Sequence, residues 1–526
     1  MGSAPVDVDV DVIVVGAGLS GVGAVAHLQD RCPDLTWTIL EARAAIGGTW
    51  DLFRYPGVRS DSDMFTLGYA FRPWTTTTAI ADGATIRDYI ADTARERGID
   101  GAVRFGHRVV SAAWSSATAR WTVTAATQEN GIVELTCRFL FFCSGYYRYE
   151  RGYEPALPGA ARFAGELVHP QHWPADLQWA GRRVVVVGSG ATAVTLVPAL
   201  AGDAAHVTML QRSPSYVLSV PTRDPLARKL FGGRLPLRWA AALVRARNIA
   251  LVTALYRLSR RRPAWMRRKL IDAARAQLPP GFAVDTHFSP AYDPWDQRLC
   301  VVPSGDLFRA VREGRASVVT DRIATLTEHG VALASGAELP ADVVVTATGL
   351  SLQMLGGAAL TVDGREVDLG RSVVYQGVLL SCVPNFALTF GYTNASWTLK
   401  ADLAATYVCR LLRYMRAHGH AVVTPVDPPT DGLAPLIALR SGYVQRGADR
   451  LPRRGSTGPW RLTNSYLRDL RVLRWGRIAD RHLRFSPAPA DAGTPGCRES
   501  HVQDARRPER GFQDTTTPRT PSPGRS

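Results

Sequence analysis

Runs of valine, isoleucine and other apolar residues recur along the chain, separated by segments of helical character. The first run covers Val10–Val15, and a second covers Val184–Val187. Runs with little polar alternation are typical of parallel strands that are buried on both faces of a sheet. Phe139–Gly145 and Ala341–Gly349 are similar runs that end in small residues. The pattern therefore predicts an α/β fold with parallel strands.

The first apolar run leads into a glycine-rich turn and then into an alanine-rich segment of helical character. The turn has Gly16, Gly18 and Gly21 in the spacing G-x-G-x-x-G, and the next strand ends at Glu41. Glycines there allow a close approach of the backbone to a pyrophosphate, and the helix N-terminus supplies N–H donors for its charge. Glu41 can accept hydrogen bonds from ribose hydroxyls. The combination predicts a Rossmann-like dinucleotide-binding domain.

A second copy of the motif follows the second valine run. It contains Gly188, Gly190 and Ala193, and alanine is tolerated at the third glycine position. The strand after it ends in Arg212 and Ser213 instead of an acid. A carboxylate would repel the 2′-phosphate of NADP, whereas an arginine can pair with it. This copy is therefore predicted to prefer NADP over NAD.

Two dinucleotide folds in one chain suggest FAD in the first and NADPH in the second, with the NADP domain inserted into the FAD domain. The C-terminal tail is rich in Pro, Gly, Ser and Thr and poor in apolar residues, so it is predicted to be disordered. The predicted organisation is a first part of the FAD domain at 8–150, a linker at 151–179, an NADP domain at 180–340 with a basic helical insertion at about 223–280, a second part of the FAD domain with a C-terminal cap at 341–485, and a disordered tail at 486–526.

Charge is concentrated in one segment of this chain, whose net charge is +16. Residues 223–269 contain fourteen Lys and Arg and one acid, Asp224. The segment also predicts a helix, which either packs on its own domain with a solvated basic face or lies on an anionic membrane surface. No nucleic-acid-binding module accompanies the charge, so nucleic acid is not an expected partner. Several apolar residues fall near one face of that helix: Leu237, Val244, Leu251, Leu255 and Leu258.

Metal binding and secretion are both disfavoured by the sequence. His169 and His172 lie three residues apart, but no Glu or Cys stands at ligand spacing nearby, and no C-x-x-C occurs in the chain. No metal is therefore expected. The N-terminus lacks the pattern of a secretory signal, and no apolar run reaches the roughly 18–20 residues that span a bilayer. A cytoplasmic location is predicted, with a peripheral contact at the inner face of the cell membrane left open.

The segment between the two nucleotide folds carries a longer motif. It reads F-x-G-x-x-x-H-x-x-x-W-P, formed by Phe163, Gly165, His169, Trp173 and Pro174. With both nucleotide motifs in the same order, this pattern resembles the fingerprint of type I Baeyer–Villiger monooxygenases, a branch of the class B flavoprotein monooxygenases. The segments GGTWDLFRYPGVRSDSDM and YDPWDQRLCVVPSGDLFRA, at 47–64 and 292–310, strengthen the likeness, which runs from about Val10 to Phe485.

The resemblance implies tightly bound FAD, NADPH as hydride donor and O2 as co-substrate. In this family a C4a-peroxyflavin attacks a ketone, and the product is an ester or a lactone. Arg298 matches the catalytic arginine, the fixed positive partner of the negative charge that develops. Asp61 matches the aspartate that holds this arginine in place. The substrate would be a small apolar ketone or a sulfur-containing compound.

The same residue-by-residue resemblance implies two sets of cofactor contacts. Arg59, Ser60 and Asp61 match positions on the nicotinamide side. The FAD set comprises Ser20, Glu41, Thr49, Trp50, Asp51, Leu52, Asp61 and the Val109 backbone. Apart from the resemblance, the glycine pair Gly47-Gly48 can let the backbone approach a flavin nucleotide. The NADP set comprises Gly188, Ser189, Gly190, Ala191, Thr192, Ala193, Val194, Arg212 and Ser213.

Two other functions stay open. One is a flavin monooxygenase that acts mainly on nitrogen or sulfur atoms. Relatives of that kind usually have Tyr or Phe where this chain has Trp173-Pro174, which favours the Baeyer–Villiger reaction. The other is a flavin- and NADP-binding redox sensor that has lost oxygenation. The presence of Arg298 and Asp61 argues against it.

Overall fold

The computed structural model of the chain describes residues 6–127, 129 and 131–488. Its last strand, β25 (Leu483–Ser486), pairs with β22 (Val422–Pro425). The boundary of the tail predicted at Ser486 is therefore wrong, because this residue is part of a strand. The predicted tail from 489 onward lies outside the described residues.

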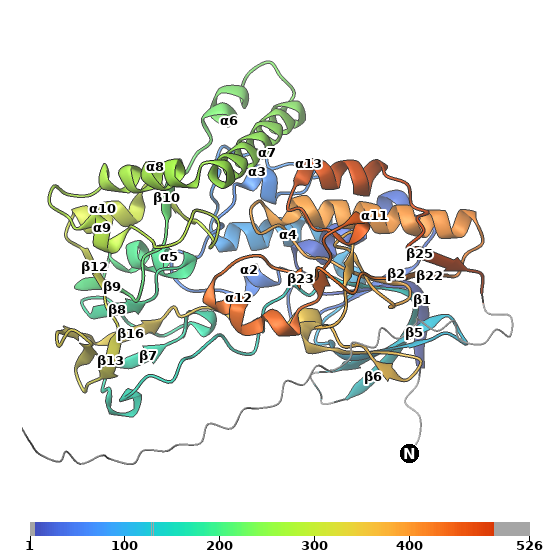
Figure 1. Cartoon of the computed structure of the whole chain (residues 1–526), viewed down its shortest axis with the longest axis horizontal. Helices are drawn as coiled ribbons and strands as arrows, with labels where there is room; N and C mark the ends of the chain where they lie inside the picture. Colours follow the sequence, from blue (N-terminus) through green and yellow to red (C-terminus); the bar gives the residue numbers. More distant parts are fainter. Residues whose placement is uncertain (1–5, 128, 130, 489–526) are drawn as a thin grey trace, which may run out of the picture. The chain divides into compact units, whose positions relative to one another are not determined.

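The first sheet carries the glycine turn expected to bind FAD (Figure 1). Strand β1 (Val6–Val15) pairs in parallel with β2 (Trp37–Leu40) on one side and with β6 (Ile132–Phe142) on the other. Strands β5 (Arg120–Ala126) and β4 (Arg108–Ser115) continue the sheet beyond β6 as an antiparallel meander. The other strands of this sheet are β3 (Val103–Arg104), β17 (Ala359–Val362), β18 (Arg365–Glu366) and β21 (Phe386–Leu388).

Both faces of β1 are buried, which explains its nearly continuous apolar run. Successive residues of a strand point to opposite faces of the sheet. Val12 and Val14 belong to the core on one face, and Ile13 and Val15 to the core on the other. The helices that contribute to the first core include α1 (Leu19–Arg31), α4 (Gly83–Glu96) and α11 (Trp397–Ala417).

The second sheet carries the glycine turn expected to bind NADP, and all five of its strands are parallel. In sheet order the strands are β12 (Ala316–Thr320), β9 (His206–Gln211), β8 (Arg183–Val187), β16 (Val343–Thr346) and β7 (Glu166–Val168). Helices α5 (Ala191–Leu200) and α10 (Asp306–Arg312) share its core. The edge strand β7 comes from the segment predicted to be a linker, so part of that segment belongs to the sheet.

The chain passes between the two sheets twice, and the two passages lie side by side. The backbone N–H of Arg148 donates to the carbonyl oxygen of Ser351 at 2.9 Å. That of Tyr153 donates to the carbonyl oxygen of Gly349 at 3.0 Å. The outgoing and returning segments therefore form a short antiparallel pair. An α/β fold with two Rossmann-like domains, one inserted into the other, is confirmed.

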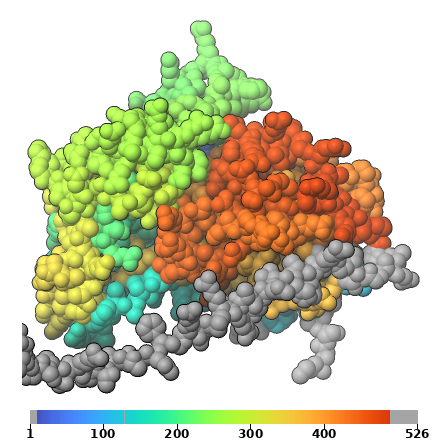
Figure 2. Space-filling view, in the orientation of Figure 1, coloured from blue at the N-terminus to red at the C-terminus, as the bar shows by residue number. Residues whose placement is uncertain are grey.

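Three helices occupy the basic insertion: α6 (Pro225–Leu230), α7 (Leu237–Arg261) and α8 (Pro263–Arg275). They lie along the top of the view, where α6 and the start of α7 rise above their neighbours (Figures 1 and 2). Helix α7 packs against α3 (Met64–Leu67). In the described part of the chain, no helix combines the length and apolar character needed to cross a membrane.

Shorter elements connect these parts. The helices among them are α2 (Thr49–Leu52), α9 (Val284–His287), α12 (Gly442–Gly447) and α13 (Tyr466–Asp469). The strands are β10 (Val217–Val220), β11 (Cys300–Pro303), β13 (Ile323–Leu326), β14 (Gly330–Leu333), β15 (Glu338–Pro340), β19 (Val374–Tyr375), β20 (Leu379–Leu380), β23 (Ala434–Pro435) and β24 (Arg453–Arg454).

Candidate active site

A cavity of about 800 Å³ lies where the glycine turns of the two sheets meet. Ligands of open α/β sheets bind at the carboxyl ends of the strands, which is where both turns stand. The residues of the sequence-predicted site that line this cavity are Gly16, Gly18, Ser20, Glu41, Gly48, Thr49, Trp50, Arg59, Ser60, Asp61, Val109, Gly188, Ser189, Gly190, Ala191, Thr192, Arg212, Ser213 and Arg298.

The first turn fits a dinucleotide because its backbone leaves no room for side chains. Gly16 has a φ of +103°, and a Cβ there would lie 2.9 Å from the carbonyl oxygen of Cys143. Gly48 has a φ of +56°, and its Cβ would lie 3.0 Å from the Cα of Gly18. The backbones of Gly18 and Gly48 thus lie close together, and no side chain on either one blocks the approach of the FAD pyrophosphate to the turn.

Glu41 stands at the end of β2, as the dinucleotide motif requires. Its carboxylate accepts hydrogen bonds from the N–H groups of Ala17, at 2.7 Å, and Arg43, at 2.8 Å. These bonds orient the carboxylate at the cavity wall. Burial raises the pKa of Glu41. Its oxygens have further lone pairs, so they fit the ribose hydroxyls of FAD.

The first glycine of the second turn is required by the backbone for the same reasons as Gly16. Gly188 has a φ of +141°, and a Cβ there would lie 2.4 Å from the carbonyl oxygen of Ala347. Ser189 Oγ donates to the carbonyl oxygen of Ser213 at 2.9 Å, which ties the turn to the end of β9. Next to Ser213, Arg212 is exposed at the cavity and forms no ion pair with any described residue. An unpaired guanidinium at this place suits a 2′-phosphate.

A second arginine, which the sequence did not single out, faces the same part of the cavity. Arg446 of α12 lies with its guanidinium 3.4 Å from the centre of the Tyr153 ring. Burial and the nearby charge of Arg212 lower the pKa of Arg446. The two cations come from sequence positions more than two hundred residues apart, which is why no local motif indicated the pair.

Arg298 and Asp61 form a two-point ion pair inside the cavity. Nε of Arg298 lies 2.8 Å from Oδ2 of Asp61, and Nη2 donates to Oδ1 at 3.3 Å. The attraction of Asp61 raises the pKa of Arg298, so the guanidinium is charged at every physiological pH. The two side chains are about one-third exposed, 33% and 29%, and thus face the cavity.

Three tyrosines surround Arg298, and the sequence did not single them out either. The hydroxyls of Tyr146 and Tyr147 lie 2.7 Å apart, and Tyr443 adjoins both Tyr146 and Arg298. Burial raises the pKa of all three. Tyr146 and Tyr147 directly follow the small-residue turn after β6. Their position at the end of a strand is the sequence signal that could have indicated them.

Trp397 extends this aromatic group toward Ser20, a residue expected to contact FAD. Its ring stacks on Tyr146 with the ring centres 5.3 Å apart, and its Nε1–H donates to Ser20 Oγ at 2.7 Å. Ser20 therefore already has a partner within the protein.

Arg59 and Ser60, expected on the nicotinamide side, line the cavity but have partners of their own. Arg59 pairs with Asp306 at the start of α10, with Nη1 2.5 Å from Oδ2. This ion pair joins the FAD part of the chain to the NADP part. The hydroxyl of Ser60 donates to the carbonyl oxygen of Ser62 at 2.6 Å.

Five residues expected to contact a cofactor do not line the cavity: Gly21, Asp51, Leu52, Ala193 and Val194. Asp51 instead binds two arginines, Arg43 at 2.5 Å and Arg54 at 2.9 Å. A Cβ on Gly21 would lie 1.8 Å from the carbonyl oxygen of Gly16, so this glycine serves the packing of helix on turn. Leu52, Ala193 and Val194 are buried core residues.

The F-x-G-x-x-x-H-x-x-x-W-P segment packs against the outgoing passage between the sheets. A Cβ on Gly152 would lie 2.0 Å from Cε1 of His169, so the imidazole ring occupies that space. Nε2 of Gln171 donates to the carbonyl oxygens of Arg148, at 2.8 Å, and Tyr149, at 2.9 Å. The motif thus holds the passage that connects the two domains.

The rest of the motif packs within the NADP part. Gly165 allows close contact, because a Cβ there would lie 2.4 Å from the carbonyl oxygen of Asp342 and 2.6 Å from Cζ of Phe163. Trp173 meets Trp179 edge to face at 5.9 Å, and Pro174 follows Trp173 in the half-buried part of the segment.

Neither His169 of the motif nor the nearby His172 has the surroundings of a metal ligand. His169 is partly buried, which lowers its pKa, and Nδ1 accepts from the N–H of Gln171 at 3.2 Å. His172 is exposed, and its Nε2 lies 3.0 Å from the carbonyl oxygen of Glu150. Among the residues described, no group of three or more His, Cys, Asp or Glu is arranged to hold a metal ion.

Comparison with protein families matches two parts of this chain. Residues 14–78 match the NAD(P)-binding Rossmann-like domain. Residues 78–228 match the flavin-binding monooxygenase-like family.

Two mycobacterial proteins are similar over nearly their whole length. The FAD-containing monooxygenase EthA of Mycobacterium tuberculosis is 54% identical over 486 residues, which are 92% of this chain and 99% of that protein. The FAD-containing monooxygenase EthA of Mycolicibacterium smegmatis is 53% identical over 479 residues, which are 90% of this chain and 97% of that protein.

Solved structures share the fold at low sequence identity. An oxidized steroid monooxygenase bound to NADP gives a TM-score of 0.70 at 22% identity, covering 91% of this chain and 100% of that chain. A complex of OTEMO with FAD and NADP gives 0.65 at 21% identity, covering 80% and 86%. The open structure of cyclohexanone monooxygenase gives 0.70 at 20% identity, covering 91% and 100%.

Fold, cavity and relatives together define an FAD-containing monooxygenase that binds NADP. The chain belongs to the type I Baeyer–Villiger monooxygenase family within the class B flavoprotein monooxygenases. The family, the fold class and both cofactors predicted from the sequence are thereby confirmed. The individual contacts of each cofactor stay predictions.

Proposed function

We propose that this enzyme uses NADPH and O2 to insert one oxygen atom next to a ketone carbonyl, which gives an ester or a lactone. The observation that carries the proposal is the Arg298–Asp61 ion pair, which stands in the cavity between the two glycine turns. FAD, reduced by NADPH, supplies the activated oxygen when it is bound. The residues of the chain supply charge, orientation and a dry site.

The role proposed for Arg298 follows from its charge and geometry. Oxygen insertion places negative charge on oxygen atoms beside the substrate carbon. A fixed guanidinium stabilises such charge more than water does, because it is oriented before the reaction. Asp61 holds two of the guanidinium nitrogens, and Nη1 has no described partner, so it can donate into the cavity.

The role proposed for Arg212 is recognition of NADPH. The residue faces the cavity beside the second glycine turn and is free of acidic partners among the described residues. The 2′-phosphate is the group that distinguishes NADPH from NADH, so a cation at this place selects NADPH.

The surroundings of Arg298 favour an apolar substrate. Tyr146, Tyr147, Tyr443 and Trp397 place aromatic surface around the ion pair. Aromatic walls exclude water, which strengthens electrostatic interactions and limits hydrolytic side reactions. A small apolar ketone fits these walls, and so does a thioether or thiocarbonyl compound, whose oxidation at sulfur is the second reaction we propose for this site. The cytoplasm stays the predicted place of action.

Replacing Arg298 tests the proposal. The Arg298→Ala variant should retain FAD and its reduction by NADPH, seen as loss of the yellow flavin absorbance, but should form ester at least about a hundredfold more slowly. Arg298→Lys should recover part of the rate, because it restores the charge without the two-point geometry. Arg322→Ala, at an exposed site of the NADP domain, is the matched control.

Product analysis decides between the candidate functions. Linear, cyclic and aryl ketones and a matched sulfide should be offered to the wild-type enzyme with NADPH. Ester or lactone supports the proposal, whereas sulfoxide with no ester makes the enzyme a heteroatom monooxygenase. Return of all the consumed oxygen as hydrogen peroxide would favour a redox sensor. Unchanged ester formation by Arg298→Ala would remove Arg298 from the reaction.

A further inference from the structure

Helix α7 turns an apolar face away from the protein. Trp239, Leu243 and Leu251 are 58%, 54% and 56% exposed, which is unusual for large apolar side chains on one helix. Exposed alanines at 246, 250 and 254 continue this face between them. The apolar residues around 235–265 that lie open are Leu235, Leu237, Trp239, Leu243, Leu251, Leu258 and Trp265.

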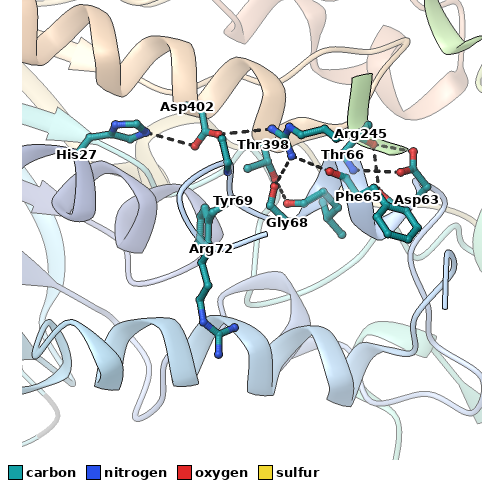
Figure 3. A network of polar contacts seen from close by, with 12 residues as sticks. His27, Asp63, Phe65, Thr66, Gly68, Tyr69, Arg72, Arg245, Thr398 and Asp402 are labelled. Carbon is teal, nitrogen blue, oxygen red and sulfur yellow. Dashed lines mark hydrogen bonds and ion pairs between the residues drawn. The ribbon is translucent and has the colours of Figure 1, made fainter. Parts of the chain in front are cut away.

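The opposite face of α7 carries polar and charged groups into the protein (Figure 3). Nη1 of Arg245 donates to the carbonyl oxygens of Phe65 and Gly68, both at 2.7 Å, and Nη2 lies 3.6 Å from Asp402. Asn248 is buried and donates to Asp63 at 2.8 Å. The same face also buries Ala240, Ala241 and Val244, so it is part apolar and part polar. The predicted alternative of a surface helix that packs on its own domain agrees with these contacts, although the central turns expose apolar residues where basic ones were expected.

This polar inner face fixes which side of α7 points outward. Nε2 of His27 lies 3.4 Å from Oδ1 of Asp402, so the carboxylate that faces Arg245 is contacted from two sides. Arg247 stands between Leu243 and Leu251 on the outward side of the helix, and its half-buried guanidinium pairs with the buried Asp224 at the start of α6. Rotating the helix to bury Trp239 would break these ion pairs and leave buried charges unpaired, which is costly. The apolar face is thus held outward by the fold.

Exposed cations are frequent on α7 and on the segments next to it in the chain. Ten of them form no ion pair with any described residue, and on α7 itself Arg257 and Arg261 continue the outward face toward the C-terminal end. The ten are Arg223, Arg228, Lys229, Arg234, Arg238, Arg257, Arg261, Arg262, Arg268 and Lys269.

We propose that the face formed by Trp239, Leu243 and Leu251, together with the exposed cations of residues 223–269, docks on an anionic lipid surface. The apolar side chains would enter the boundary between headgroups and acyl chains, and the arginines and lysines would bind the headgroup phosphates. A second copy of the chain is a poor occupant, because two such faces would bring like charges together. The anionic surface supplies the opposite charge.

The location of this face agrees with peripheral docking. At about 1.5 Å per residue, the 25 residues of α7 form a helix about 37 Å long, which offers an extended contact in the membrane plane. None of residues 223–269 lines the cavity between the glycine turns. Docking therefore leaves the cofactor-binding residues free.

Vesicle binding by the full-length holoenzyme tests the proposal. Two kinds of vesicle are compared, phosphatidylcholine alone and phosphatidylcholine with about one-third phosphatidylglycerol. The protein should sediment with the anionic vesicles, should remain in solution with the neutral ones, and should dissociate as salt rises from about 50 to about 500 mM.

Two sets of variants separate the apolar and the charged contributions. Trp239→Ser/Leu243→Ser should lower the partition coefficient about tenfold or more, and Ile132→Ser, at a 52% exposed position on β6, should not change it. Arg257→Gln/Arg261→Gln should weaken binding and its salt dependence. Arg309→Gln/Arg322→Gln, which removes the same charge elsewhere, should have a much smaller effect. Because all these side chains are exposed, NADPH oxidation without vesicles should stay at the wild-type rate.

Three results would overturn the proposal. One is failure to bind anionic vesicles at low salt. Another is equal loss of binding in the Ile132→Ser control. The third is a dimer in sedimentation velocity that Trp239→Ser/Leu243→Ser dissociates, without vesicle binding, which would assign the face to a second copy of the chain. None of these readouts depends on the product formed, so the result stands apart from the proposed reaction.

Discussion

Two arginines of the cavity, Arg298 and Arg212, differ in whether an acidic side chain pairs with them. Asp61 holds Arg298 at two points, which fixes the direction of its remaining donors. Arg212 is exposed and has no acidic partner in the described chain. A paired guanidinium is oriented for charge that appears during a reaction, whereas an unpaired one is available to a ligand that brings its own charge. The same residue type thus suits two different roles.

The unpaired arginine should determine the choice of nicotinamide cofactor. We expect Arg212→Ala to raise the Kd for NADP⁺ roughly tenfold to a hundredfold, because a charge-assisted contact with the 2′-phosphate is lost. The Kd for NAD⁺ should change little. Arg446→Ala should act in the same direction, since Arg446 faces the same part of the cavity. Calorimetric titration of the holoenzyme measures both constants.

The matched control is Arg309→Ala, on the exposed side of α10. Equal weakening of NADP⁺ and NAD⁺ by Arg212→Ala would show that Arg212 does not recognise the 2′-phosphate.

At the scale of an element, the first two glycines in the turn of the NADP domain differ in why a glycine is needed there. Gly188 has a positive φ, and its Cβ would meet the backbone of Ala347, so the fold requires it. Gly190 has a negative φ, and no atom lies within 4 Å of where its Cβ would be. The fold has room for a side chain there, so we expect the requirement for Gly190 to come from the ligand.

Alanine at each position should therefore give different results. Gly188→Ala should lower the Tm of the protein, with a cost of about 1–3 kcal/mol or more from backbone strain and contact. Gly190→Ala should leave the Tm unchanged but raise the Kd for NADP⁺, because a methyl group would stand where the pyrophosphate approaches. Thermal unfolding and NADP⁺ titration measure the two effects. A large fall in Tm for Gly190→Ala would contradict this assignment.

At the scale of the whole molecule, the FAD and NADP parts are joined by the paired passages and by ion pairs across the cavity. His169 packs against Gly152 on the outgoing passage, and Arg59 binds Asp306 on the NADP side. These contacts hold the two glycine turns toward one cavity. Hydride transfer needs the two cofactors in a defined relative position, so the contacts of the passages should affect the reaction without touching either cofactor.

Gly152→Ala should disturb this arrangement, because its Cβ would enter the space of the His169 ring. We expect flavin reduction by NADPH to slow by about tenfold or more, whereas FAD content and the Kd for NADP⁺ should change little. Rapid-mixing absorbance measures the rate. Adding His169→Ala should relieve the steric contact and restore the Tm lost in Gly152→Ala.

Gly101→Ala is the control, since no atom lies within 4 Å of its Cβ position. If Gly152→Ala reduced flavin at the wild-type rate, the passage would not set the relative position of the cofactors.

The fold could be predicted from the sequence because its signals are local. Each glycine turn lies within one strand–turn–helix segment, and Arg212 follows the next strand directly. The surroundings of Arg298 could not be predicted in this way, since Tyr443 reaches it from a distant part of the chain. The resemblance implies that Asp51 contacts FAD, but in the fold its carboxylate pairs with Arg43 and Arg54.

The orientation of α7 could not be predicted from the sequence either. Its charges could be counted in the sequence, but which of them point inward depends on partners elsewhere. Asp63 and Asp402 lie far from α7 along the chain and bind Asn248 and Arg245. Helical periodicity describes the faces of a helix, and only the tertiary partners decide which face is covered.

The pairing of the outgoing and returning passages also has a consequence for the evolution of the chain. Tyr153 and Gly349 are joined by a hydrogen bond of 3.0 Å, so the two ends of residues 154–348 are neighbours in space. A block with adjacent ends can be replaced by another of different length without stretching the host sheet. Residues 154–348, which form the NADP part, therefore have the geometry of a segment that can be exchanged as one unit. A chimera that takes this block from a relative should keep its FAD and acquire the cofactor preference of the donor.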